Sequence, residues 1–491
     1  MPLQIIQRLD NQTIQWVGQP LMFAFSNDAV VSGVPTQYFN VKFVAEIFIS
    51  GDTINPAVTT DLIATVKVVP NNKGVGIFNL RSVIESYVKP QRDGYADATT
   101  TSKYKGVGYS TDPHPIHVID KWCLNDVGYK EMRCRFTIEA ATYVGGPVLT
   151  IGSAGSSVTT GEIYLMNAYV PNETRYQRMT SPIRYYNNMQ ANAATNYYQY
   201  NSDSFVLSNA PTTQYANRYD YGVFSALSSY PTSGMIIVES HIVWTSRAGV
   251  VSSAFTTTNN AANGGATPTT ETKTQMVSVG AFPANIMEQN AAFKTAIIAD
   301  NVDYYDIKLR GGSGSTATKT YRIIVNCAKK NDAFTIDGYN KGYTPIRLCW
   351  LNSLGGWDYY TFTMKSIKKL KTKKTKYQQL EGTWNGEGYN ILGWKGGQKD
   401  YRVNTTENVV MNSDFMSEDD AEWFEFLMNS NEVYIMEQRD INNNNMNNTN
   451  FWMRPVTLKT SSFTRKTIAN DKLIQYKIEV EKSRIQNNQN A

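Results

Sequence analysis

Short apolar stretches that end at glycine, proline, asparagine or serine dominate the chain. They are rich in β-branched and aromatic residues and have the length of single strands: Val41–Ile49, Asp61–Val69, Arg133–Tyr143, Gly161–Tyr169, Met235–Trp244, Tyr304–Arg310, Lys319–Cys327, Ile346–Leu351, Tyr359–Met364 and Leu473–Val480. Strands of this length and spacing are typical of β-sandwiches and β-barrels. The sequence therefore predicts a mainly β, multi-domain protein of β-sandwich (Ig-like) and β-barrel modules with a few short helices.

Two segments instead repeat apolar residues at helical spacing. In Leu80–Tyr87 the repeat ends shortly before Pro90, and in Glu418–Met428 it places Trp423 and Phe424 on one face. Apolar residues at i, i+3, i+4 and i+7 predict amphipathic helices. Both segments are short and flanked by predicted strands, so we expect these helices to cover the ends of β domains.

Changes in composition suggest four parts of the chain. Gly145–Gly161 is rich in glycine, serine and threonine, and 256–275 is small and polar, as loops and linkers are. We expect an N-terminal β-sandwich domain at 1–150, a Tyr/Asn-rich insertion or arm at 156–225, a second β-sandwich domain at 226–366, and a C-terminal β-barrel-like domain with one helix at 367–491.

Composition and charge exclude several classes of protein. With 12% aromatic and 18% charged residues among its 491, the chain is too aromatic and too apolar to be disordered throughout. Its 47 basic and 42 acidic residues leave a net charge of +5, which is small for a specific nucleic-acid binder. No apolar run approaches the roughly 18 residues of a membrane helix, so we expect no membrane span. Four cysteines and no secretory signal favour synthesis in a reducing cytoplasm.

One cluster has the residue types of a metal site, namely His114, His117, Cys123 and Cys134. Zinc prefers four nitrogen and sulfur ligands in a tetrahedral arrangement. The spacing of these residues matches no common zinc finger or ribbon, and free cysteines are usually just buried. We therefore expect two loop histidines and two buried strand cysteines, with no metal and no cofactor.

Catalysis has few candidate residues. Only three histidines are present, and neither a Gly-x-Ser-x-Gly nor a His-Glu-x-x-His motif occurs. A glycosidase needs two facing carboxylates. Three carboxylates lie near tryptophans in the sequence, which is a mixture found around sugars: Asp358, Glu381 and Glu387, close to Trp357, Trp384 and Trp394. Nothing in the sequence fixes their separation, so we expect that the protein is not an enzyme.

The segment Lys365–Lys376 holds seven lysines in twelve residues. Such a run could follow phosphates, but it contains no arginine and no interleaved aromatic residue. We expect a solvated edge strand or linker that its lysines protect from aggregation, or a contact with a protein of complementary charge. The candidate contact residues are Lys369, Lys371 and Lys373.

Residues 172–221 are rich in tyrosine and asparagine and nearly free of aliphatic periodicity. Tyrosine provides a large contact area at a low cost in conformational entropy, so it is frequent in recognition surfaces and in subunit interfaces. We expect either a glycan-binding surface or an extension that packs against neighbouring subunits. The candidate interface residues are Tyr185, Tyr186, Tyr197, Tyr198 and Tyr200.

Four patches of the sequence resemble virion proteins. Arg347–Phe362 carries the pattern W-L-N-x-x-G-G-x-D-x-Y-x-F, which resembles a motif of virion proteins from tailed phages, particularly phages of Bacteroidota hosts. Gly76–Val88 looks like their segment after the first strands, and Ala421–Tyr434 is similar to their capped helix leading into a strand. Lys466–Val480 resembles the closing strands of tail-barrel domains. The order of these patches makes the chain similar to virion structural proteins of the tail or baseplate type.

The first of these patches also has a physical interpretation. Its residues predict a strand, a tight turn and a returning strand, because glycine permits positive φ and an Asn or Asp side chain can close a turn on the backbone. Trp350, Tyr360 and Phe362 are expected on core faces. The motif residues are Trp350, Asn352, Gly355, Gly356, Asp358 and Phe362.

The resemblance implies a bacteriophage virion structural protein, made in the host cytoplasm and located in the tail as a baseplate, hub or adsorption-apparatus subunit. Such subunits form homo-oligomeric rings or collars and bind other tail proteins through large interfaces. A receptor- or glycan-binding tail protein that contacts a host surface glycan is one alternative. A head or neck decoration protein is the other. The sequence determines neither the copy number nor the receptor.

Overall fold

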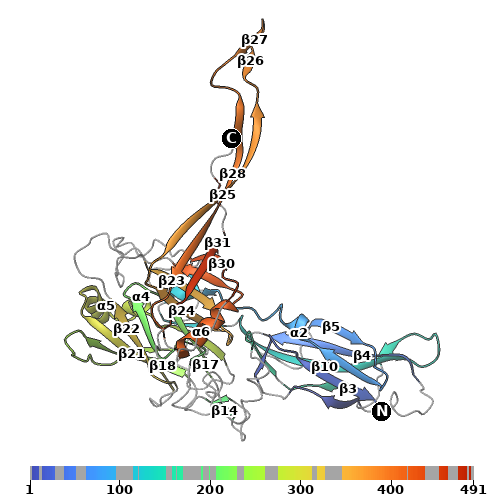
Figure 1. Cartoon of the computed structure of the whole chain (residues 1–491). Coiled ribbons are helices and arrows are strands. Elements are labelled where there is room, and N and C mark those ends of the chain that lie inside the picture. Colours follow the sequence, from blue (N-terminus) through green and yellow to red (C-terminus); the bar gives the residue numbers. More distant parts are fainter. Residues whose placement is uncertain are drawn as a thin grey trace. The chain divides into compact units, whose positions relative to one another are not determined.

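The computed structural model describes residues 3–9, 14–27, 38–50, 62–94, 114–119, 121–125, 127–150, 157–161, 163–169, 190–191, 198–199, 206–208, 210–228, 237–259, 275–311, 318–326, 345–416, 418–436, 453–462, 474–483 and 486–487. Strands make up 57% and helices 9% of these residues, so the chain is mainly β and the predicted fold class is confirmed. The strands form several separate sheets (Figure 1). None of the sheets built from the described residues closes into a barrel.

Contacts between residues divide the chain into two compact units. The first unit comprises 1–214, 221–325 and 351–358, and the second comprises 215–220, 326–350 and 359–491. The four-domain division expected from the sequence stays a prediction. No helix among the described residues is long and apolar enough to span a membrane.

The first unit begins with two sheets that pack face to face. One sheet has the order β1-β3-β6, from β1 (Leu3–Gln7), β3 (Met22–Asn27) and β6 (Val75–Asn79). The other has the order β2-β13-β10-β4-β5, with β11 and β12 beside β10, from β2 (Ile14–Trp16), β4 (Phe39–Ser50), β5 (Leu62–Val68), β10 (Tyr129–Ala141), β11 (Leu149–Thr150), β12 (Val158–Thr159) and β13 (Ile163–Met166).

Alternation along β10 builds the core between these sheets. Buried and half-exposed residues alternate along this strand, because successive side chains of a strand point to opposite faces. Its Phe136 ring lies 5.1 Å from the Phe23 ring and 4.0 Å from the Phe25 ring, both on β3 of the other sheet. This aromatic contact identifies the pair of sheets as a β-sandwich.

Two further sheets and two helices complete the first unit. One sheet has the order β17-β20-β9, from β9 (Trp122–Asn125), β17 (Val223–Ser228) and β20 (Gln275–Gly280). The other has the order β16-β22-β21-β18-β19, from β16 (Thr213–Asn217), β18 (Ile237–Ser246), β19 (Phe255–Thr258), β21 (Val302–Gly311) and β22 (Tyr321–Asn326). The helices are α4 (Pro283–Gln289) and α5 (Ala291–Ile298).

The second unit is built on one long sheet. Its order is β24-β23-β29-β30-β31-β28-β25, with β32 beside β28, from β23 (Ile346–Leu351), β24 (Trp357–Phe362), β25 (Ile367–Gln379), β28 (Gly397–Asn412), β29 (Val433–Met436), β30 (Met453–Leu458), β31 (Lys477–Lys482) and β32 (Gln486–Asn487). Helix α6 (Glu418–Met428) has the predicted bounds and packs Trp423 and Phe424 against Trp350, with ring centroids 5.1 and 6.2 Å apart.

The first predicted helix is much shorter than its periodicity suggested. Only Arg81–Ile84 is helical, as α2, and turns follow to Tyr87. Leu80 at the N-cap position offers no side-chain hydrogen bond, although the Asn79 side chain accepts one from the Arg81 N–H at 3.2 Å, and so short a helix pays the cost of nucleation for few backbone bonds. The remaining short elements are β7 (Asp93–Gly94), β8 (His114–Pro115), η2 (Ile116–Val118), β14 (Gln190–Ala191), β15 (Tyr198–Gln199), β26 (Gly382–Trp384) and β27 (Tyr389–Ile391).

Candidate interaction surface

A two-stranded ribbon extends from the sheet of the second unit. It consists of β25, β28 and the segment between them, residues 367–412, and Figure 1 shows it running beyond the other strands of its sheet. On its other side β28 pairs with β31 only through Asn408–Asn412, and with β32 only at Asn404 and Thr405. Toward the tip, the two strands have only each other as partners among the described strands. Every residue of β25 except the last is exposed.

The sequence of the ribbon explains why it forms strands without a buried face. Threonine and tyrosine have high β-propensity, and they face each other in cross-strand positions such as Thr372 opposite Thr405. A β-bulge between Thr375 and Lys376 interrupts the register, and beyond it the rings of Tyr377 and Tyr401 meet edge to face at 6.4 Å. Cross-strand pairs of this kind stabilise a ribbon that lacks a core.

The lysines of β25 divide between the two faces of the ribbon. Lys368 and Lys374 lie on one face, 4.0 and 2.8 Å from the carboxylates of Glu407 and Asp400. Lys369, Lys371 and Lys373 lie on the other face, opposite Asn408, Thr406 and Asn404. Among the described residues, no carboxylate comes within 4.0 Å of these three ammonium groups. We call Lys369, Lys371 and Lys373 the lysine row.

The tip of the ribbon is a small hairpin with a closed turn. The Asn385 side-chain oxygen accepts hydrogen bonds from the backbone N–H groups of Glu387, at 3.3 Å, and Gly388, at 3.2 Å. Gly386 has a φ of +97°, which glycine adopts without the steric cost that a Cβ would add. The strands β26 and β27 on either side of the turn pair from Gly382 with Ile391 to Trp384 with Tyr389.

This pairing gives the tip one apolar and one polar face. Trp384, Tyr389 and Ile391 share a face, and Thr383 and Asn390 share the other, because paired and alternate residues of a hairpin lie on the same side. We call the first set the apolar tip face. Trp384 is 69% exposed and Ile391 74% exposed, so the described part of the chain leaves this face uncovered.

No protein-family model matches the sequence, and neither does any curated protein.

The structure places the residues singled out in the sequence in different settings. Lys369, Lys371 and Lys373 come together as the lysine row. Glu381 and Glu387 are exposed near the tip. Four of the tyrosine candidates lie outside the described residues, namely Tyr185, Tyr186, Tyr197 and Tyr200. The fifth, Tyr198, has its backbone in β15.

The apolar tip face was missed as a candidate interaction site. A signal for it existed, because Asn385-Gly386 between apolar alternate residues is typical of a tight β-hairpin. The sequence alone gave no reason to expect that the hairpin would stand clear of a core.

The residues of the recognisable motif make a structural turn. Asn352 lies between β23 and β24, and its side-chain oxygen accepts hydrogen bonds from the N–H groups of Leu354 and Gly356, both at 3.0 Å. Its amide donates to the Asp358 carboxylate at 3.0 Å, and the Ser208 hydroxyl donates to the same oxygen at 2.6 Å. Asp358 is thus buried and hydrogen-bonded. Of the three residues expected on core faces, Trp350 and Phe362 are buried and Tyr360 is half-buried.

The glycines of this turn allow other backbone segments to approach closely. A Cβ on Gly356 would lie 2.1 Å from the carbonyl oxygen of Leu207. We expect Gly356→Ala to lower the free energy of unfolding by about 1–3 kcal/mol, because overpacking forces the backbone to shift. Thermal unfolding measures this as a lower Tm. Gly388→Ala is the control, since its Cβ would meet nothing within 4 Å. Equal Tm values for the two variants would contradict this interpretation.

The described side chains of the candidate metal cluster, His117, Cys123 and Cys134, have structural settings. His117 is buried with its ring edge-to-face against Trp357, at 4.7 Å. Cys123 and Cys134 are buried in strands. Among the described residues, no three His, Cys, Asp or Glu side chains are placed to share a metal ion.

The buried thiols are expected to be inert. Burial raises the pKa of Cys134 and of Cys349 well above that of an ordinary thiol. Because the thiolate is the nucleophile, we expect iodoacetamide at pH 8 to leave both residues unmodified in the folded protein and to alkylate both in urea. Mass spectrometry of the digested protein measures the extent of alkylation. Rapid alkylation without urea would show that these strands open readily.

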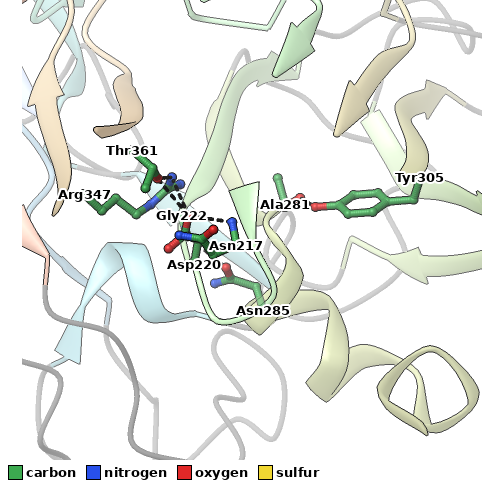
Figure 2. A network of polar contacts seen from close by, with 8 residues as sticks. All are labelled: Asn217, Asp220, Gly222, Ala281, Asn285, Tyr305, Arg347 and Thr361. Atoms are coloured by element: carbon green, nitrogen blue, oxygen red, sulfur yellow. Dashed lines mark hydrogen bonds and ion pairs between the residues drawn. The ribbon is translucent and has the colours of Figure 1, made fainter. Parts of the chain in front are cut away.

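A buried ion pair fixes a short segment onto the sheet of the second unit. Figure 2 shows Asp220 accepting hydrogen bonds from Thr361 at 2.8 Å, from the Asn217 N–H at 2.9 Å and from Arg347 at 3.3 Å. The Arg347 guanidinium also donates to Thr361 at 2.9 Å and lies 5.1 Å from the centroid of the Tyr359 ring. The side chains of Arg347 and Asp220 are 2% and 0% exposed. This network stabilises the fold and offers no accessible group to a ligand.

Figure 2 also shows a separate polar contact set within the first unit. Asn285, on α4, accepts a hydrogen bond from the Gly222 N–H at 2.9 Å. It also donates to the carbonyl oxygen of His117 at 3.0 Å. The Tyr305 hydroxyl donates to the carbonyl oxygen of Ala281 at 2.8 Å. These bonds satisfy backbone groups around the start of α4, so they too are structural.

Proposed function

We propose that this chain is a structural subunit of a tailed-phage virion, located in the tail, which acts by binding neighbouring protein subunits. The main support for this proposal is the ribbon. A two-stranded hairpin is only marginally stable in water by itself, and this one ends in an apolar face that nothing in the described chain covers. Exposed apolar surface of this kind marks interaction sites. The likeness of Arg347–Phe362 to tailed-phage virion motifs supports the virion as the assembly.

Aromatic composition favours a protein contact at the tip. Tryptophan and tyrosine are enriched at the centre of protein interfaces, where they contribute most of the binding energy. The tip offers Trp384 and Tyr389 on a backbone held by hydrogen bonds to Asn385. A preorganised aromatic pair loses little entropy on binding. The tip therefore suits insertion into a neighbouring subunit.

A glycan-binding tail protein is the second candidate function. The exposed rings of Trp384 and Trp394 could stack on sugar rings, and the exposed carboxylates of Glu381 and Glu387 lie near them in sequence. Binding of purified protein to host surface polysaccharide on a glycan array would support this function. The lysine row has no role in binding a neutral sugar, so this candidate explains less of the ribbon.

Labelling of assembled particles tests the proposed function. A gold label on a C-terminal tag of the chain, viewed by electron microscopy of purified phage particles, is expected at the tail, repeated around its axis. A label on the head or neck would favour a decoration protein instead. Absence of the chain from a mass-spectrometric digest of the particles would overturn the proposal.

A further inference from the structure

The lysine row is an arrangement that the fold itself does not require. Among the described residues no carboxylate lies within 4.0 Å of its ammonium groups, whereas Lys374 on the opposite face has its carboxylate at 2.8 Å. Alternate residues of a strand are roughly 7 Å apart, so Lys369, Lys371 and Lys373 form a line of three like charges. Like charges so close repel one another, and a row of carboxylates on a partner would offset this repulsion.

The same row argues against pairing between two copies of this ribbon. β25 is the edge strand of its sheet, so its outer backbone groups are open to another strand. Lysines on an edge strand prevent edge-to-edge pairing of identical strands, since two copies would bring like charges together. With a net charge of +5 on the whole chain, a second copy is a poor source of the missing carboxylates. The partner of the row is therefore a different molecule.

The apolar tip face determines what kind of molecule this partner is. A bilayer is disfavoured, because Glu387 lies in the turn at the outer end of the tip hairpin and would enter the membrane with it. Nucleic acid would match the lysines but leave Trp384, Tyr389 and Ile391 uncovered. A protein surface can provide both an acidic row and an apolar pocket, as interfaces combine a polar rim with an apolar centre.

We infer that the ribbon binds a different protein of the same particle, through a row of carboxylates facing Lys369, Lys371 and Lys373 and an apolar pocket that receives Trp384, Tyr389 and Ile391. This inference rests on the proposed function, because it takes the partner from the virion. The charged row sets the orientation and speeds the encounter, while the tip contributes most of the affinity.

Zero-length crosslinking of intact particles tests this inference. A water-soluble carbodiimide joins a lysine amine to a carboxylate only where the two are in contact, and the amides are located by mass spectrometry of the digest. We expect Lys369, Lys371 and Lys373 to be joined to Asp or Glu of another polypeptide. The matched control lies in the same strand: Lys374 is expected to be joined to Asp400 of its own chain, from which it is 2.8 Å away.

The outcomes separate the inference from the proposed function. Absence of the chain from the particle digest would refute the virion role itself. If the chain is present and Lys374 is joined to Asp400, but the lysine row is unjoined or joined only to carboxylates of this same sequence, then the inference is wrong and the virion role stands. Vesicles of phosphatidylglycerol and phosphatidylethanolamine provide a second measurement, since binding of the purified chain to them would assign the ribbon to a membrane and overturn the inference.

Discussion

Asp220→Ala is expected to lower the free energy of unfolding of the second unit by about 3–5 kcal/mol, because removing one partner of a buried ion pair leaves the other charge uncompensated. Arg347 would remain 2% exposed without its carboxylate, and Thr361 and the Asn217 N–H would lose their acceptor. The positive charge would remain, because arginine stays protonated in proteins.

Native-state hydrogen exchange, read on peptides from β23 and β24, measures this loss within the second unit. The control is Asp400→Ala, which breaks an ion pair of the same unit whose side chains are 50% and 30% exposed. Exposed pairs contribute about 0–1 kcal/mol, so this variant should exchange nearly as the wild type does.

A second substitution tests the cause of the destabilisation. Adding Arg347→Met to Asp220→Ala should recover part of the lost stability, because it removes the orphaned charge and keeps an apolar side chain of similar length. If the two single variants, Asp220→Ala and Asp400→Ala, show the same hydrogen exchange, then leaving the Arg347 charge buried without a partner does not destabilise the unit, and the interpretation is wrong.

This ion pair also shows where prediction from the sequence ends. Arg347 and Asp220 are 127 residues apart, and neither lies in a local pattern that points to the other. Pro283–Gln289 escaped prediction as a helix for a related reason: its first five residues are all buried, so it shows no amphipathic stripe. Contacts distant in the sequence, and complete burial, remove the periodicity on which such predictions depend.

Local signals, in contrast, were sufficient for several elements. The strand at Ile346–Leu351 has the predicted bounds, because a short apolar run before a turn residue determines both its type and its end. Helix α6 also has its predicted bounds, since its apolar stripe of Trp423, Phe424 and Leu427 repeats at helical spacing. The Asn352 turn follows from one side chain that bonds two nearby N–H groups.

The candidate site lies between these extremes. The density of lysines was visible in the sequence, but the division into paired and unpaired lysines depends on the register with β28, which brings Asp400 opposite Lys376 and within reach of Lys374. That register is set by the turn at the far end of the ribbon and by the bulge beside Lys376. Charge patterns on one strand therefore become interpretable only once its partner strand is known.

The double substitution Trp384→Ser with Ile391→Ser is expected to weaken binding of the ribbon to its partner protein by about 100-fold or more, because anchors at the centre of an interface contribute about 2 kcal/mol or more each. Both side chains are largely exposed, at 69% and 74%, and the tip hairpin keeps its turn through Asn385. The folded chain should therefore keep its Tm, so a loss of binding would not arise from unfolding.

Particle composition measures the effect on binding. In phage assembled with the double variant, whichever joins the particle second, this chain or the protein joined to its lysine row, should be depleted, so the ratio of the two should differ from that in wild-type particles. Thr383→Ser with Asn390→Ser is the matched control, because it changes one residue in each strand of the same hairpin, on its polar face. If both double variants leave the particle composition unchanged, the apolar tip face contributes nothing to assembly. If both change it alike, the shape of the hairpin matters rather than its apolar face. Only selective loss with the first variant supports insertion of Trp384 and Ile391 into a neighbouring protein.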